Sequence, residues 1–122
     1  MSHLILKDVP AEKIHDLTFL LETNKEIKLG RPGYGNLISL GEGLVFNEGS
    51  TLEQNEATFN VSTVSRHHAT ITCPNGYVYI KDENSSNGTF INRKKLPNVG
   101  YVLKDGYTLF FGAYGPVQVY EK

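Results

Sequence analysis

Short runs rich in β-branched and aromatic residues recur along this chain between Gly, Asn, Asp and Pro residues, while helical periodicity is nearly absent. Such spacing is typical of a β-sandwich or barrel, because each strand ends at residues that favour turns. The sequence therefore predicts an all-β domain. The expected strands cover residues 3–7, 17–21, 26–30, 59–61, 69–72, 77–81, 89–91, 101–103, 108–111 and 117–120.

Three turn signals connect strands of this set, namely Pro-Asn-Gly at 74–76, Asn-Gly at 87–88 and Asp-Gly at 105–106. These residues tolerate positive φ or pre-set a turn, so the strands they join are expected to be antiparallel neighbours. Residues 11–16 are expected to form a helical turn only, because so short a segment is not stable as an isolated helix in water.

Composition narrows the class of protein. The 122 residues suffice for one domain with its own core, and 39% hydrophobic with 20% charged residues indicates a globular protein, expected to be a monomer. A net charge of −1 argues against general nucleic-acid binding, which requires many cations on one face. The single Cys73 predicts a reducing compartment, cytoplasm or nucleus. The chain shows no leader and no apolar run of about 18 residues, so neither secretion nor membrane insertion is expected.

Two polar clusters carry the chemistry of this chain, Ser-Arg-His-His-Ala at 65–69 and a run rich in Asn and Ser at 82–92, preceded by the pair Gly30 and Arg31. Arginines, small hydroxyl donors and an Asn-Gly turn are what a tetrahedral anion on an extended chain requires. A phosphomonoester carries about −1.5 to −2 charge and offers strong acceptor oxygens. The clusters therefore predict a site for a phosphorylated peptide, with no catalytic residue and no cofactor.

The order and spacing of these motifs resemble the forkhead-associated (FHA) domain, a phosphothreonine-peptide reader. Gly-Arg is followed by Ser-Arg-x-His-Ala and then by Ser-x-Asn-Gly-Thr-x-x-Asn, with 22 residues from Ser65 to Asn87. The resemblance extends from about Ile27 to about Gly112. It implies a β-sandwich of about eleven strands whose loops at one end bind phosphothreonine-containing partner proteins in signalling or scaffold assembly.

The resemblance assigns the ligand-binding residues one by one. Arg31 is implied as the principal partner of the phosphate, and Ser65 as a hydroxyl donor to it. Arg66 and Ser86 are implied to make further phosphate contacts through side chain or backbone. Asn87 is implied to bond the peptide main chain beside the phosphothreonine, which fixes the register of the peptide.

Other residues are implied to support the site. His68 occupies the structural histidine position of the family, where it ties the two binding loops together, and Gly88 allows the turn that brings Asn87 forward. The remaining supporting positions are Gly30, Thr89 and Asn92.

Residues 32–56 depart from compact members of the family, because Ser65 follows Arg31 by 34 positions, a longer separation than those members use. Five glycines predict a long loop here, with a small strand at the apolar run 44–46, and the extra length is interpreted as an insertion near the binding end. Residues 54–59 and 64–69 more narrowly resemble the FHA domains of sarcolemmal-membrane-associated proteins and their fungal relatives.

Three alternatives remain open at this stage. Ser65, His68 and Asp82 are the residue types of a hydrolase triad, although no nucleophile elbow or glycine-rich oxyanion loop accompanies them. His67, His68 and Cys73 suggest a metal site, but adjacent side chains of a strand point to opposite faces, so no metal is expected. The third alternative is an interaction domain that binds its partner without phosphate.

The basic run Arg93-Lys94-Lys95 allows two interpretations. The simpler one is the solvated end of a hairpin. The functional one is that Arg93 and Lys94 select acidic residues flanking the phosphothreonine, because Arg93 follows Asn92 on the side of the binding loops.

Overall fold

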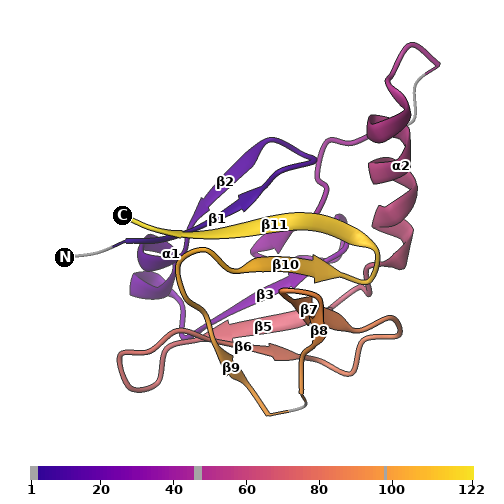
Figure 1. The fold of residues 1–122 in the computed structure, drawn as a ribbon. Helices are drawn as coiled ribbons and strands as arrows, with labels where there is room; N and C mark the ends of the chain where they lie inside the picture. The colour runs from indigo at the N-terminus through magenta and orange to yellow at the C-terminus, as the bar shows by residue number, and fades with distance from the viewer. Residues whose placement is uncertain (1–2, 46–47, 98) are drawn as a thin grey trace.

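The computed structural model describes residues 3–45, 48–97 and 99–122, in which eleven strands form two facing sheets (Figure 1). The first sheet has the order β2-β1-β11-β10-β7-β8 and the second β4-β3-β5-β6-β9. The first sheet comprises β1 (Leu4–Asp8), β2 (Lys13–Asp16), β7 (Thr89–Ile91), β8 (Lys94–Lys95), β10 (Thr108–Phe111) and β11 (Tyr114–Glu121). The second comprises β3 (Glu26–Gly30), β4 (Ile38–Ser39), β5 (Ala69–Thr72), β6 (Tyr79–Asp82) and β9 (Tyr101–Val102). The helices are α1 (Leu17–Thr23), α2 (Leu52–Asn60) and the 3₁₀ helix η1 (Val61–Thr63).

The core lies between the two sheets and follows from the alternation of side chains along the strands. In β3, Ile27 and Leu29 are fully buried while Lys28 between them is exposed. β5 pairs with β3 in antiparallel register and contributes Ile71 opposite Ile27. The first sheet supplies Leu109, Phe111, Val117 and Val119 from the opposite side. The β-sandwich predicted from the sequence is confirmed.

Four strands, β3, β5, β7 and β10, have the bounds that the sequence predicts. The expected strand at 17–21 is wrong, since this segment forms α1. Its N-cap Asp16 accepts a hydrogen bond from the backbone N–H of Phe19 at 3.2 Å, and Leu17 is buried against the sandwich. Capping and packing therefore override the β propensity of this apolar run.

Two further expectations about the N-terminal half are also wrong, and a third holds at another position. Residues 59–61 end α2 and begin η1 instead of forming a strand. The predicted helical turn at 11–16 gives way to β2, which pairs with β1. The small strand expected within the long segment is present, as β4 (Ile38–Ser39), which lies parallel to β3. Of the run 44–46, where that strand was expected, Leu44 and Val45 are not in a strand, and residue 46 lies outside the described residues.

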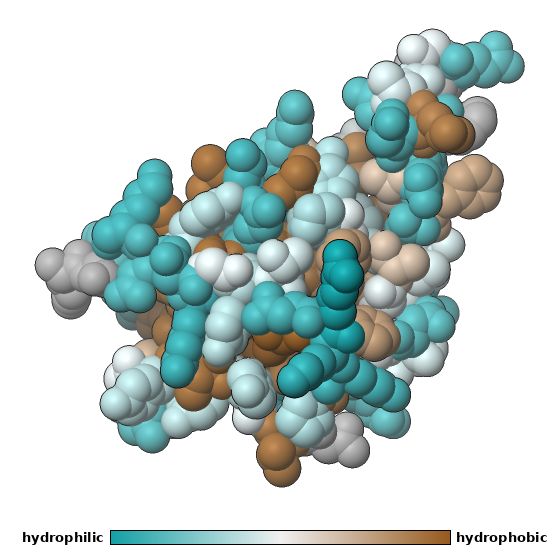
Figure 2. Space-filling model, in the orientation of Figure 1, coloured by the Kyte–Doolittle hydropathy of each residue, from teal (hydrophilic) through white to brown (hydrophobic). Residues whose placement is uncertain are grey.

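The long segment also carries the first part of α2, which projects beside the sandwich at the upper right of Figure 1. Its N-terminus has a capping box: the Thr51 hydroxyl accepts from the N–H of Gln54 at 3.1 Å, and the Gln54 side chain accepts from the N–H of Thr51 at 2.8 Å. None of its nine residues, all of them described, is buried. Leu52 and Phe59 are 79% and 69% exposed, and Figure 2 shows brown and tan side chains among teal ones over this helix.

A buried carboxylate ties the long segment to β1 and β11, two neighbouring strands inside the first sheet. Asp8, at the end of β1, accepts hydrogen bonds from the N–H of Gly41 at 2.9 Å and from the hydroxyl of Tyr114 at the start of β11. The N–H of Ala11 also donates to it, at 3.3 Å. Burial, together with the hydrogen bond and charge of Asp8, raises the pKa of Tyr114, so the phenol keeps its proton.

We expect Asp8→Ala to lower the free energy of unfolding by at least about 2 kcal/mol, because it leaves the Gly41 N–H and the Tyr114 hydroxyl without their acceptor. Tyr114→Phe should cost less, about 1–2 kcal/mol, since Asp8 then keeps its two backbone donors. Urea titration measures both values, with the exposed Glu22→Ala as control. Equal stability of Asp8→Ala and the wild type would contradict this anchoring role.

Candidate functional site

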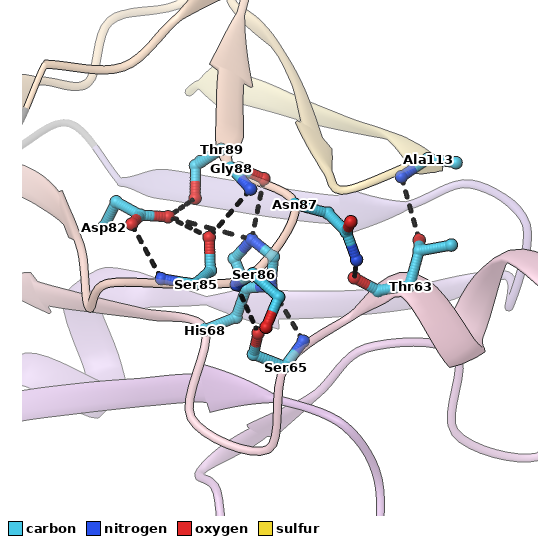
Figure 3. A network of polar contacts seen from close by, with 10 residues as sticks. All are labelled: Thr63, Ser65, His68, Asp82, Ser85, Ser86, Asn87, Gly88, Thr89 and Ala113. Carbon is cyan, nitrogen blue, oxygen red and sulfur yellow. Dashed lines mark hydrogen bonds and ion pairs between the residues drawn. The ribbon is translucent and has the colours of Figure 1, made fainter.

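One histidine joins two loops at one end of the sandwich, residues 64–68 between η1 and β5 and residues 83–88 between β6 and β7 (Figure 3). The backbone N–H of Ser65 donates to Nδ1 of His68 at 3.0 Å. Nε2 of the same ring lies 2.9 Å from the carbonyl oxygen of Gly88. Because Nδ1 accepts, Nε2 must carry the proton and donate to Gly88. The neutral imidazole therefore clamps one loop to the other.

The position of His68 follows from the strands on either side of it. Its N–H donates to the carbonyl of Leu29 in β3 at 2.8 Å, and its own carbonyl accepts from Glu83 after β6 at 2.9 Å. The ring is fully buried and meets Phe111 edge-on at 5.5 Å between centroids. Burial lowers the pKa of His68, although the Gly88 carbonyl and the charge of Asp82 act in the opposite direction.

Asp82 organises the second loop through short polar contacts. It accepts from the N–H of Ser85 at 3.0 Å, from the Ser85 hydroxyl at 2.6 Å and from the Thr89 hydroxyl at 2.7 Å. Ser85 in turn accepts from the N–H of Gly88 at 2.9 Å. Burial alone would raise the pKa of Asp82, but the hydrogen bonds from Ser85 and Thr89 and the nearby His68 outweigh it, so its pKa is lowered.

The two loops meet again at their exposed tips. The backbone N–H of Ser86 donates to the Ser65 hydroxyl oxygen at 3.1 Å. In the described part of the chain the proton of that hydroxyl has no acceptor, so it remains available to a ligand. The Asn87 side chain donates through Nδ2 to the carbonyl of Thr63 at 2.9 Å, which leaves its Oδ1 as a hydrogen-bond acceptor at the surface.

Arg31 directly follows β3 and lies against the loop of residues 64–68. Its Nε donates to the carbonyl of Val64 at 2.9 Å and its Nη2 to the carbonyl of Ser62 at 3.3 Å. These two bonds hold the half-buried guanidinium and leave its other N–H groups for an anion. Gly30 is required here, because a Cβ at this position would lie 2.0 Å from the carbonyl oxygen of Arg66.

Two supporting residues were not identified from the sequence, Tyr34 and Asn36, both in the connection between β3 and β4. Asn36 donates to the carbonyls of Arg31 at 3.2 Å and Arg66 at 2.7 Å, and its Oδ1 lies 2.8 Å from Nδ1 of His67. The exposed Arg66 guanidinium lies over the ring of Tyr34, 5.4 Å from its centroid. The one sequence signal for these residues is the pair Gly33 and Gly35 on either side of Tyr34, which indicates a tight turn.

The basic hairpin lies between β7 and β8. Asn92 and Arg93 have φ of 48° and 73°, and the Asn92 side chain accepts from the N–H of Thr108 at 3.0 Å. Arg93 and Lys94 are exposed. Lys95 is the residue of this hairpin that lies beside the second loop, with its Cε 3.2 Å from where a Cβ on Gly88 would be. Selection of flanking acidic residues by Arg93 and Lys94 stays a prediction.

The two alternative chemistries find no matching geometry in these residues. A hydrolytic triad needs the serine hydroxyl on one imidazole nitrogen and the carboxylate on the other. In this protein His68 Nδ1 faces the backbone N–H of Ser65, Nε2 faces a carbonyl, and the closest approach of Asp82 to Nε2 is 3.9 Å. Among the described residues no three His, Cys, Asp or Glu side chains are grouped as a metal site requires.

His68 should make the stability of this domain depend on pH. Its folded pKa lies below the ordinary value of 6.5, so in this range the unfolded chain binds more protons than the folded one. The contribution is fully present above about pH 6.5 and is lost as the pH falls through the folded pKa. Denaturant titrations of the wild type and His68→Gln should therefore converge between about pH 8 and about pH 5. A constant difference across this range would contradict the neutral clamp.

Comparison with solved structures identifies the same fold elsewhere. The solution structure of the FHA domain of an Arabidopsis thaliana hypothetical protein superimposes with a TM-score of 0.70 at 25% identity, covering 98% of this chain and 86% of that one. The N-terminal FHA domain of Saccharomyces cerevisiae Rad53p, solved in complex with a phosphothreonine peptide, gives a TM-score of 0.62 at 19% identity, covering 99% of this chain and 93% of that one.

Sequence relatives are much longer proteins. Vacuolar protein sorting-associated protein 64 of Saccharomyces cerevisiae is 33% identical over 91 residues, which are 70% of this chain and 15% of that protein. The human sarcolemmal membrane-associated protein is 47% identical over 45 residues, 35% of this chain and 5% of that protein. This chain thus spans about a seventh or less of the length of these relatives. In the described residues no helix is long and apolar enough to cross a membrane.

The sequence model of the FHA domain matches residues 38–112, more than half of the chain. Arg31 precedes the matched segment, but strand β3 pairs with β5 and brings it to the loop that holds Ser65. With its two-sheet sandwich and its histidine-clamped loops, the chain belongs to the FHA domain family.

Proposed function

We propose that this domain binds phosphothreonine-containing segments of partner proteins and so recruits them into signalling or scaffold assemblies. The observation that carries the proposal is the convergence at one loop cluster of the Arg31 guanidinium, the Ser65 hydroxyl and the Asn87 amide, each with hydrogen-bonding capacity left over. Arg66 and Ser86 lie at the same exposed tips. The Rad53p domain, which has this fold, was solved with a phosphothreonine peptide.

The chemistry of the cluster suits a phosphate dianion. A planar guanidinium matches the spacing of phosphate oxygens, and hydrogen bonds to ionised groups contribute about 1.5–3 kcal/mol each. With a net charge of −1 for the whole chain, the attraction must come from the local arginines and not from a general positive field. After the cost of ordering a flexible peptide, an affinity near 1 μM, about −8 kcal/mol, is expected.

Binding without chemistry is the role that the geometry supports. His68 is fully buried and both of its nitrogens are engaged, so it is not placed to act as a general base on a bound ligand. The Ser65 hydroxyl accepts a backbone N–H instead of contacting the imidazole. These contacts support structural roles for His68 and Asp82 and a ligand-binding role for Ser65.

Arg31→Ala should lower phosphopeptide affinity by at least about 2 kcal/mol, roughly thirtyfold, because it removes the charge-assisted contact. Because Arg31 also donates to two loop carbonyls, the thermal unfolding of the variant must be recorded beside the titration. Lys28→Ala is the matched control, because Lys28 is exposed on β3, the strand that precedes Arg31, and carries the same charge. Unchanged affinity in a folded Arg31→Ala protein would refute the site assignment.

The site should prefer phosphothreonine to phosphoserine and reject glutamate. The resemblance to FHA domains implies a small apolar niche for the threonine γ-methyl at residues 86–89, where one methyl would be worth about 1–3 kcal/mol. A planar carboxylate cannot reach Arg31, Ser65 and Arg66 together as a tetrahedral phosphate does. Calorimetric titration with three peptides that differ only at this residue, and with the unphosphorylated peptide, tests this.

Binding of the unphosphorylated or glutamate peptide at comparable affinity would replace the proposal with a phosphate-independent interaction domain. Equal affinity for phosphothreonine and phosphoserine would remove the methyl niche alone.

A further inference from the structure

A groove of about 460 Å³ runs between α2 and the turn that joins β10 to β11. Its floor and one side are largely apolar and are formed by Val9, Pro10, Phe110, Ala113 and Pro116. The other wall is one side of α2. Because α2 buries none of its residues in the sandwich, the helix contributes little to the core and presents this wall to the outside.

Thr63 of η1 links the groove to the loop cluster formed by residues 64–68 and 83–88, because it bonds to both. The Thr63 hydroxyl accepts from the N–H of Ala113, a groove residue, at 2.9 Å. The Thr63 carbonyl accepts from the Asn87 side chain, also at 2.9 Å. A chain held beside Asn87 therefore reaches the groove within a few residues, since an extended chain advances about 3.3 Å per residue.

The charge of the groove is opposite to that of the loop cluster. Glu53 and Glu56 of α2 line it and are exposed, and within the described part of the chain neither carboxylate is paired with a cation. The loop cluster, by contrast, presents Arg31 and Arg66. The end of the molecule is thus electrostatically two-sided, basic where the phosphate is proposed to bind and acidic beside α2.

We infer that this groove binds the segment flanking the phosphothreonine in the same partner, and that it selects an apolar residue accompanied by Lys or Arg. The inference rests on the proposed function and adds to it the class of partner sequence. An apolar side chain would cover the floor of Val9, Phe110 and Pro116, while the neighbouring cation would pair with Glu53 or Glu56. α2 then determines which sequences flanking the phosphothreonine this domain selects.

The test uses the whole 122-residue protein and phosphothreonine peptides with three kinds of flank: Gly and Ser only, Leu with Lys, and Leu with Glu. Each flank is placed once before and once after the phosphothreonine. On one of the two sides the Leu-Lys peptide should bind about tenfold more tightly than the Gly-Ser peptide, and the Leu-Glu peptide should lose that advantage.

The double variant Glu53→Gln/Glu56→Gln should reduce the Lys-over-Glu preference to about twofold or less while keeping the affinity for the Gly-Ser peptide. The matched control is Glu22→Gln/Glu26→Gln, which removes the same charge from exposed residues of α1 and β3. That control should keep the full preference.

Ala57→Trp, which fills the groove from α2, should abolish the contribution of Leu. Thermal melts check that each variant is folded, and the peptide series on the wild type tests the inference without any variant.

Equal binding of all flanks on both sides would overturn the inference and leave phosphate recognition standing. Loss of Gly-Ser peptide binding in the Glu53→Gln/Glu56→Gln protein would also overturn it, because α2 would then support the phosphate site itself. If no peptide bound in a phosphate-dependent way, the proposed function would fail instead.

Discussion

The site of this domain depends on one buried imidazole that joins two loops which the chain alone does not connect. His68 accepts from the backbone of Ser65 and donates to the carbonyl of Gly88, so both loops are held from below while their tips stay exposed. If the ring were protonated, its Nδ1–H would face the N–H of Ser65, and both groups are donors. Burial lowers the pKa of His68 and so keeps the ring in the neutral form that this contact requires. A clamp of this kind fixes the tips before a ligand arrives and so reduces the ordering cost of binding.

Much of the sandwich was predictable because buried residues alternate with more accessible ones along its central strands, as in β3 and β10. α1 was not, since its apolar run has β propensity and the deciding contacts are a cap from Asp16 and tertiary packing. The sequence of α2 contains a helix-start signal, the capping box of Thr51 and Gln54. The helix was not predicted because it buries none of its residues, so its sequence shows little apolar periodicity. β2 and β4 depend on pairing with distant strands, which no local pattern encodes.

The sequence identified the site residues that lie in its ordered polar motifs, and it missed those that only the fold brings to the site. The linear order of Arg31, Ser65 and Asn87 indicated a phosphate site, and the structure brings their loops together. Asn36 and Thr63 were missed because only the fold brings them to their partners, which are backbone groups and the side chains of His67 and Asn87. The contacts of Thr63 also show how the loop tips are connected to the groove beside α2. The sequence indicated only that the segment between Arg31 and Ser65 is long.

Binding of phosphopeptide at the histidine-clamped loop tips can be followed through the backbone amide resonances of isotope-labelled protein during titration with a phosphothreonine peptide. We expect the largest shifts at residues 65–67 and 86–88 and at Arg31, and we expect the unphosphorylated peptide to leave these resonances unchanged. Largest shifts on α1 or along β9, at a distance from these tips, would contradict it.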